Sequence, residues 1–350
     1  PSSLHRKGLE AQLLLEKARE QVADALGCLP EEAYFTSGAT EANNIAIQGA
    51  FAAHKRRGNT LVSTAVEHSS VRSTLQMLSQ QQNANVVLVG PQPQGEMDPD
   101  TLCREVTEDT LLLSCNLVNS EVGAISDLAV ITRQAKRQNP KVLVHTDGVQ
   151  ALGKVDFSLK KLGVDLASFS GHKLHAPKGV GVLYVKKGVR LLPLFYGGGQ
   201  EKGLRPGTES MPLIAALGTA VNALPDLNKE MAAMKELNMF LRKGLSEIEG
   251  VAINSPDDAL PYILNFSAGG VRAETMLHFL SEHGIYVSSG SACSKGHESH
   301  VLKAMGLPRE RVDEACEFLR WVADDHFVFL GYREYALGSS PDDTVLRALP

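Results

Sequence analysis

Short apolar runs rich in valine and leucine alternate with segments of helical periodicity along the first half of the chain. The runs that predict strands are residues 33–36, 60–64, 86–89, 111–116, 142–146, 164–168 and 180–185. Helical spacing of apolar residues predicts helices at residues 9–26, 40–57, 70–80 and 128–138. Strands that are apolar at almost every position are covered on both faces. The fold class predicted is therefore α/β, a mainly parallel sheet between helices.

The pattern changes at residue 197, where three glycines open a loop that runs to residue 208. A long helical segment follows at residues 212–248. Further strands are predicted at 252–267 and 285–288, with a helix at 273–283 between them. This change predicts a large domain over residues 1–225, a smaller α+β domain over residues 226–313, and an atypical tail over residues 314–350.

Composition narrows the class of protein. The 350 residues are 43% hydrophobic and 21% charged, which is typical of a soluble globular chain with room for two domains. The net charge of −5 favours neither a nucleic acid nor an anionic membrane as a partner. No apolar run approaches the roughly 20 residues of a membrane span. The five cysteines are odd in number and widely spaced, so we expect a reducing, cytoplasmic setting.

A lysine in a glycine-flanked turn, Lys173, follows the apolar run that ends at Phe169. At the end of a buried strand, desolvation disfavours the ammonium form, and a neutral amine can attack a carbonyl. Asp147 ends another strand-like run. A Schiff-base lysine and an aspartate for a pyridinium nitrogen are the minimal protein groups that pyridoxal phosphate requires. The pair predicts a site for this cofactor beyond the carboxyl ends of the strands.

Further polar residues lie at predicted strand ends. The helix that begins near Thr40 directly follows a strand, so its free N–H groups can bind an anion, although a plain N-cap is the alternative. The His68 imidazole, at a strand-to-helix turn, can stack on a flat cofactor. The alternative is a structural histidine whose hydrogen bonds are made within its own loop. Ser170 and His172 flank the lysine and can donate to a phosphate. Gln150 can reach a phenolic oxygen of the cofactor.

Cys293 lies among glycines and small polar residues, unlike the other four cysteines, which lie in or beside apolar patterns. Exposure and the neighbouring Lys295 favour a nucleophilic thiolate. A metal site with His297 and His300 is the alternative, but no fourth ligand is evident, and we predict no metal.

These motifs occur in an order that resembles the group I cysteine desulfurases, class V aminotransferase-like enzymes of pyridoxal phosphate fold type I. The resemblance covers residues 1–312 and is carried by residues 35–41, 67–68, 147–150, 170–173, 205–208 and 288–293. It implies a fold type I large domain, a smaller domain that carries the cysteine loop, and pyridoxal 5′-phosphate as the cofactor. The implied reaction converts L-cysteine to L-alanine and passes sulfur to an acceptor or scaffold protein for iron–sulfur clusters or tRNA thiolation.

The resemblance also implies a role for each matching residue. Lys173 forms the Schiff base and shuttles a proton, and the Cys293 thiolate takes the substrate sulfur as a persulfide. The cofactor would be held by Ala39, Thr40, His68, Asp147, Gln150, Ser170, His172 and, in the partner subunit of a homodimer, Thr208. His68 is also a candidate for proton transfer, and Asn119 is the candidate substrate-binding residue.

The chain departs from the family pattern at several points. Relatives begin with a further segment that is expected to be missing here, and Ser120 stands where many have a second asparagine. Relatives carry a substrate-binding arginine at the position that counting assigns to Glu317. The segment from about 314 to 340 resembles a fragment of the large NAD-specific glutamate dehydrogenases. A catalytically impaired, cofactor-binding chain and a selenocysteine lyase-like enzyme therefore stay as alternatives.

Overall fold

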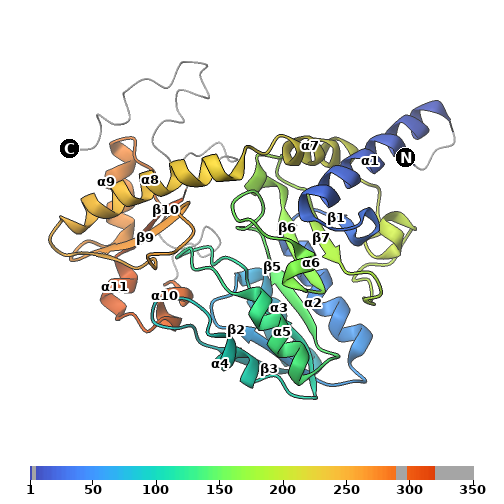
Figure 1. The fold of residues 1–350 in the computed structure, drawn as a ribbon, viewed down its shortest axis with the longest axis horizontal. Coiled ribbons are helices and arrows are strands. Elements are labelled where there is room, and N and C mark those ends of the chain that lie inside the picture. Colours follow the sequence, from blue (N-terminus) through green and yellow to red (C-terminus); the bar gives the residue numbers. More distant parts are fainter. Residues whose placement is uncertain (2–4, 289–297, 320–350) are drawn as a thin grey trace.

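A computed structural model of the chain describes residue 1, residues 5–288 and residues 298–319 (Figure 1). The helices are α1 (Arg6–Leu26), α2 (Ala39–His54), α3 (Ser69–Gln82), α4 (Pro99–Arg104), α5 (Leu128–Gln138), α6 (Leu159–Leu162), α7 (Met211–Asn222), α8 (Leu227–Ser246), α9 (Ala273–Glu282), α10 (His300–Ala304) and α11 (Arg309–Asp313). The strands are β1 (Ala33–Thr36), β2 (Thr60–Thr64), β3 (Asn85–Val89), β4 (Thr110–Ser114), β5 (Leu143–Asp147), β6 (Leu166–Ser170), β7 (Gly181–Val185), β8 (Val251–Ile253), β9 (Ile263–Ala268) and β10 (Ala315–Leu319). Short 3-10 helices are η1 (Pro30–Glu32), η2 (Gly171–Leu174) and η3 (Gln200–Gly203).

The large sheet has seven strands in the order β1-β7-β6-β5-β4-β2-β3. Each neighbouring pair from β6 through β3 in this order is parallel, whereas β7 runs antiparallel to both β6 and β1. The predicted mainly parallel sheet is therefore confirmed. The seven strands predicted before residue 190 coincide with β1 to β7, to within two residues at either end.

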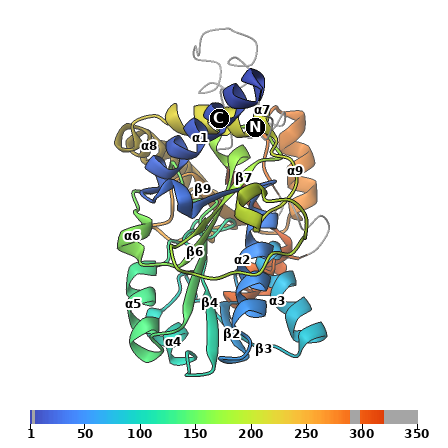
Figure 2. The ribbon, with the colours of Figure 1, turned by 90° about the vertical axis from the view of Figure 1, so that its right-hand side faces the viewer.

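Helices cover both faces of this sheet, as the apolar strands required. Leu61 and Leu112 pack in a core cluster with α2 and α3, whereas their neighbours Val62 and Leu113 face a second cluster that includes α1, α4 and α5. All four side chains are at most 1% exposed, because successive residues of a strand point to opposite faces. Figure 2 shows α2 and α3 on one side of the sheet and α5 and α6 on the other.

The second sheet is smaller and antiparallel, in the order β10-β9-β8. Phe266 of β9 and Phe318 of β10 stack with ring centroids 5.4 Å apart, in a separate apolar cluster beneath α9. The strand predicted at 285–288 is wrong, since only Ser288 pairs, in an isolated bridge with Glu317. The predicted helix at 212–248 is two helices, α7 and α8, because Pro225 interrupts it and Asp226 caps α8. Residues 315–319 of the predicted tail form β10.

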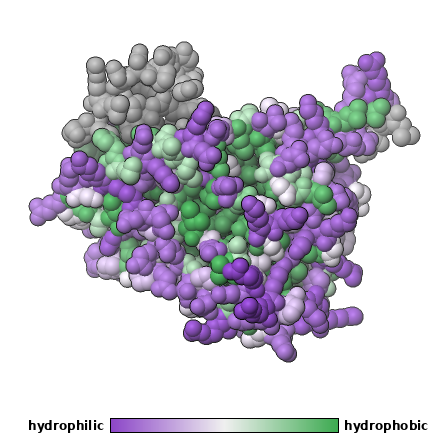
Figure 3. Space-filling model, in the orientation of Figure 1, coloured by the Kyte–Doolittle hydropathy of each residue, from purple (hydrophilic) through white to green (hydrophobic). Residues whose placement is uncertain are grey.

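The loop after β4 joins the two sheets. Leu260 N–H donates to the Gly123 carbonyl oxygen at 2.8 Å, and Asn265 Nδ2 donates to the Glu121 carbonyl oxygen at 3.2 Å. Figure 3 shows a largely polar face on which apolar side chains gather near the centre. Among the described residues, no helix combines the length and apolar composition that a membrane span requires.

Candidate functional site

Several of the residues predicted to bind the cofactor lie at the carboxyl ends of the parallel strands. Asp147 is the last residue of β5, and Ser170 is the last residue of the neighbouring strand β6. The two strands are parallel, with Asp147 opposite Ser168. Lys173 follows in η2, so the lysine and the aspartate lie at the same edge of the sheet. This is where open α/β sheets bind their ligands.

A hydrogen-bonded network connects Asp147 to His68. The Asp147 carboxylate accepts from Val149 N–H at 3.1 Å and from Asn43 Nδ2 at 2.9 Å. The same Asn43 amide donates to Ser70 Oγ at 2.8 Å, and Ser70 Oγ lies 2.8 Å from His68 Nδ1. Because Asp147 is 7% exposed and its oxygens are held from two sides, its orientation is fixed. A carboxylate fixed in this way suits a protonated ring nitrogen.

The His68 side chain has a structural role in the same network. It is the N-cap of α3, and its Nδ1 accepts from Ser70 N–H at 3.1 Å. His68 Nδ1 therefore serves as an acceptor, which leaves Nε2 as the nitrogen that can donate.

The N-terminus of α2 lies beside Ser170 and forms a cradle. Gly38 is the N-cap, has no side chain to cap the helix, and has a φ of 152°. The N–H groups of Ala39 and Thr40 belong to the first turn, where helical N–H groups have no partner within the helix. A Cβ placed on Gly38 would lie 3.6 Å from Ser170 Oγ, in the space that the glycine leaves empty.

Two further features make this cradle suitable for a phosphate. A Cβ on Gly181 would lie 2.6 Å from Gly38 Cα, so glycine at 181 lets β7 approach the start of α2 closely. Ser170 Oγ lies 2.8 Å from His172 Nδ1. Hydroxyl, imidazole and backbone N–H groups at a helix N-terminus are donors that an anion requires. The residues present therefore fit the phosphate of the predicted cofactor.

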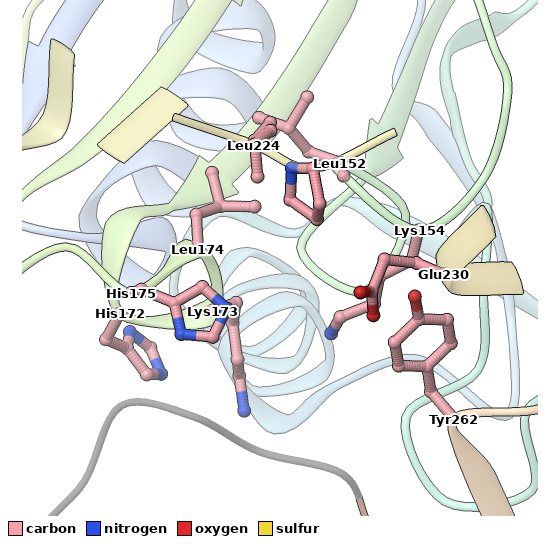
Figure 4. Close-up of a pocket in the computed structure, with 11 residues that line it drawn as sticks. Leu152, Lys154, His172, Lys173, Leu174, His175, Leu224, Glu230 and Tyr262 are labelled. Atoms are coloured by element: carbon pink, nitrogen blue, oxygen red, sulfur yellow. The ribbon is translucent and has the colours of Figure 1, made fainter. Parts of the chain in front are cut away.

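A pocket of about 70 Å³ lies beside Lys173 (Figure 4). Its wall includes His172 and His175 on one side, and Lys154, Glu230 and Tyr262 on the other. Asp147 and His68 do not line it. Lys154, which no sequence motif singled out, donates from Nζ to Gln150 Oε1 at 2.9 Å.

Three buried carboxyl groups surround this part of the fold. Burial raises the pKa of Glu67 to about 8, and the negative charge of Asp147 adds to the effect. Burial also raises the pKa of Glu121. The pKa of Glu317 lies well above its ordinary value because of burial and the charge of Glu121, whereas Lys173 acts in the opposite direction. Glu317 therefore lies close enough to Lys173 for the lysine charge to affect its pKa.

Several predicted residues do not join this group. The Asn119 side chain is 2% exposed and is committed to backbone groups: its Nδ2 donates to the Val66 carbonyl, and its Oδ1 accepts from the N–H groups of Glu121 and Val122. These contacts hold the loop, and a substrate contact for Asn119 stays a prediction. Thr208 is exposed, as a residue that serves a partner subunit would be.

The predicted nucleophile Cys293 and the alternative metal ligand His297 lie outside the described residues. His300 is described: its Nε2 lies 2.9 Å from the Glu67 carbonyl oxygen, and burial lowers its pKa to about 4. Within residues 5–288 and 298–319, no group of three or more His, Cys, Asp or Glu side chains is arranged to hold a metal ion.

Fold and site together define an α/β enzyme with a lysine, an aspartate and an anion cradle at the carboxyl edge of its sheet. Residues 1–309 match the aminotransferase class-V family, and the chain belongs to this family. Enzymes of this family depend on pyridoxal phosphate, which supports the predicted cofactor.

Curated relatives agree with this assignment. The chain is 37% identical over 323 residues to "Cysteine desulfurase IscS" of Dictyoglomus turgidum, covering 91% of this chain and 81% of the relative. It is 42% identical over 317 residues to "NifS/IcsS protein homolog" of Lactobacillus delbrueckii subsp. bulgaricus, covering 88% and 81%.

Solved structures give the same result. A "NifS-like protein" is 40% identical, with a TM-score of 0.86 over 92% of this chain and 86% of that one. A structure described as "SspA in complex with cysteine" is 32% identical, with a TM-score of 0.81 over 91% and 90%. The predicted family and fold class are confirmed by these similarities.

Proposed function

We propose that this chain is a pyridoxal phosphate-dependent cysteine desulfurase, which converts L-cysteine to L-alanine and holds the released sulfur as a persulfide. The observation that carries the proposal is the convergence of Asp147 and Lys173 at one edge of the parallel sheet, beside the free N-terminus of α2. The names of the relatives supply the substrate, because they are cysteine desulfurases and one similar structure contains cysteine.

The cofactor-binding roles follow from the donors and acceptors at this edge. The first N–H groups of α2, at Ala39 and Thr40, bind the phosphate together with Ser170 and His172. The Asp147 carboxylate holds the proton of the pyridine nitrogen, and Asn43 keeps that carboxylate in place. His68 offers its ring face for stacking, and Gln150 donates to the phenolic oxygen. Thr208 reaches the phosphate of the second subunit in a homodimer.

When bound, pyridoxal phosphate supplies an electron sink for the charge that develops at the substrate Cα. The Lys173 amine removes and returns the proton at this carbon. The Cys293 thiolate then attacks the substrate sulfur, the Cβ–S bond breaks, and protonation of the remaining three-carbon unit gives L-alanine. The persulfide on Cys293 is passed to a sulfur acceptor or scaffold protein.

The test is to load the purified protein with pyridoxal phosphate, record its visible absorbance, add L-cysteine, and assay alanine and sulfide. We expect visible absorbance and turnover for the wild type. Lys173→Ala should abolish the absorbance of the covalently held cofactor, whereas Cys293→Ala should keep it and lose sulfide release. Lys136→Ala is a matched control, because Lys136 is a partly buried lysine of α5 that pairs with Asp165. Full sulfide release by Cys293→Ala would refute the nucleophile, and a colourless wild type would refute the cofactor.

One observation favours a second candidate, a chain that binds the cofactor but turns cysteine over poorly. Glu317 is 1% exposed, and its Oε2 has no hydrogen-bond partner among the described residues. It lies in β10 at the position where relatives are expected to carry an arginine for the substrate carboxylate. A carboxyl group there offers no cation to the carboxylate of cysteine, and in its ionised form it repels that carboxylate. Visible absorbance without alanine formation would support this second candidate.

A further inference from the structure

A buried lysine that the proposed reaction does not use lies in the pocket beside Lys173. Lys154 is 9% exposed, although lysine is almost never buried without a partner. Figure 4 shows Lys154 between Lys173 and Tyr262. Its Nζ lies 5.9 Å from the centre of the Tyr262 ring. Placing a lysine here costs free energy, so the contacts that it makes require an explanation.

The hydrogen bond of Lys154 is made to Gln150, which lies three residues after Asp147. Nζ lies 2.9 Å from Gln150 Oε1. Among the described residues, Lys154 is the one hydrogen-bond partner of the Gln150 side chain, which is 5% exposed. Burial lowers the pKa of Lys154 to about 8, so the side chain is still mostly an ammonium at neutral pH.

The chemistry of the donor decides how the Gln150 amide is turned. A lysine ammonium has three N–H donors and no acceptor, whereas the glutamine amide has one oxygen acceptor and one nitrogen donor. Only the oxygen of Gln150 can therefore face Lys154. The Nε2 group then points away from Lys154 and is free to donate to another acceptor. With an apolar residue at 154, neither amide orientation would be preferred.

We propose that Lys154 is a positioning residue that fixes the amide of Gln150 so that Nε2 donates to the phenolic oxygen of bound pyridoxal phosphate. The inference rests on the proposed function, because it requires that cofactor. A donated hydrogen bond stabilises the ionised phenolic oxygen, whereas a flipped amide would turn a carbonyl oxygen toward it and destabilise that form.

A double-mutant cycle on the cofactor-loaded protein tests the inference. The variants are Lys154→Met, Gln150→Leu and the double substitution. The readouts are the pH midpoint of the change in visible absorbance and the dissociation constant of pyridoxal phosphate. We expect each single variant to shift the midpoint and to weaken cofactor binding by about threefold to tenfold, the value of one hydrogen bond. The double variant should be no worse than Gln150→Leu alone, because both changes remove the same interaction.

Two controls separate positioning from a general effect on folding. Lys136→Met also removes a partly buried lysine with a defined partner, and it should leave the midpoint unchanged. Lys154→Arg keeps a donor-only head group and should keep the wild-type midpoint, and it serves as the test if Lys154→Met does not fold.

The outcomes distinguish this inference from the proposed function. Additive effects in the double variant would overturn the inference and leave the proposed function standing. A Lys154→Arg midpoint shifted as far as that of Gln150→Leu would do the same. A wild-type protein that takes up no pyridoxal phosphate overturns the proposed function and the inference together.

Discussion

At the scale of single residues, buried carboxyl groups dominate the surroundings of the site. Glu67, Glu121 and Glu317 are each at most 2% exposed, and the pKa of each is raised. A carboxyl group in this environment is stable in its neutral form, in which it can donate as well as accept a hydrogen bond. Protein stability and substrate choice should therefore depend on these three groups.

Glu67 should make the protein less stable as the pH rises. Its pKa is about 8 in the folded state and 4.5 ordinarily, so between these values the folded state binds more protons than the unfolded state. The free energy of unfolding should thus fall between pH 5 and pH 8, by on the order of 4 kcal/mol from this group. Glu67→Gln, which resembles the protonated form, should remove this part of the slope. Urea unfolding at several pH values measures it.

The exposed Glu247 supplies the control for this experiment. Glu247→Gln should leave the pH dependence of the unfolding free energy as it is in the wild type. An unchanged slope in Glu67→Gln would contradict the assignment of the effect to Glu67.

Glu317 should limit the use of L-cysteine. Glu317→Gln resembles the neutral form that burial favours and should change little, whereas Glu317→Arg supplies a cation for the substrate carboxylate. We expect kcat/KM for L-cysteine to rise at least about tenfold in the arginine variant, since charged hydrogen bonds contribute about 1.5–3 kcal/mol. Steady-state alanine formation measures this. Glu310→Arg, on the exposed face of α11, adds the same charge elsewhere and should change nothing. A wild type faster than Glu317→Arg would show that Glu317 does not oppose the substrate.

At the scale of elements, the start of α2 and the start of β7 form the anion cradle only because both are glycine. Gly181→Ala places a Cβ 2.6 Å from Gly38 Cα and from the Phe169 carbonyl oxygen, so the backbone must move. We expect a loss of about 2 kcal/mol in the free energy of unfolding. Affinity for pyridoxal phosphate should fall at least about tenfold, because the N–H groups of α2 shift. Calorimetry and cofactor titration measure the two effects.

Gly244, inside α8, supplies the control for the Gly181 substitution, because a Cβ at Gly244 meets nothing within 4 Å. Gly244→Ala should leave cofactor affinity unchanged and raise stability by about 0.5–1 kcal/mol, the ordinary gain of alanine over glycine in a helix. Equal cofactor affinity in Gly181→Ala and the wild type would rule out the cradle as the phosphate site.

The loop after β7, which the sequence alone did not explain, is held by ion pairs to α1 and α2 and by a hydrogen bond to β1. Arg19 of α1 binds Glu201 through a bond of 2.6 Å, and Glu201 also accepts from Phe35 N–H of β1 at 2.9 Å. Arg205, four residues further on, donates to Glu41 of α2 at 3.0 Å. These contacts bring the segment that leads to Thr208 beside the cradle.

At the scale of the whole molecule, the first turns of α1 project from the body of the protein (Figure 1). Leu9 and Leu13 are 56% and 57% exposed there, and Tyr196 of the loop after β7 is 86% exposed. Apolar surface of this kind is typical of an interface between subunits. A homodimer would cover it and would give the exposed Thr208 a partner site.

Sedimentation should therefore give a mass near twice 37.7 kDa for the wild type. Leu13→Lys should weaken the dimer at least about tenfold, because a buried leucine contributes about 1.5–3 kcal/mol. Leu88→Lys is the control: Leu88 is 48% exposed, but it lies on β3 at the opposite edge of the sheet from β1, which α1 contacts. A monomeric wild type, or equal effects of the two variants, would contradict a dimer through α1.

The large sheet was predictable from the sequence, because its apolar strands and the helices between them have periods of two and 3.6 residues that can be read locally. The sequence also placed Asp147, Ser170 and Lys173 at one edge, since polar residues that end parallel strands must meet there. The sequence did not point to Asn43 or Lys154. Their roles depend on hydrogen bonds to Asp147 and Gln150, and these hydrogen bonds are visible only in the folded structure. The prediction from sequence failed at residues 285–288, where β pairing depends on a distant strand and not on local pattern.

Which polar groups lose their contact with water depends on the folded structure. Glu67 and Glu317 are ordinary carboxyl groups in the sequence, and their raised pKa values come from burial by segments far apart along the chain. The same is true of the Gly38–Gly181 contact that opens the anion cradle. Desolvation and close approach depend on distances in space, and a linear sequence specifies these only through the complete fold.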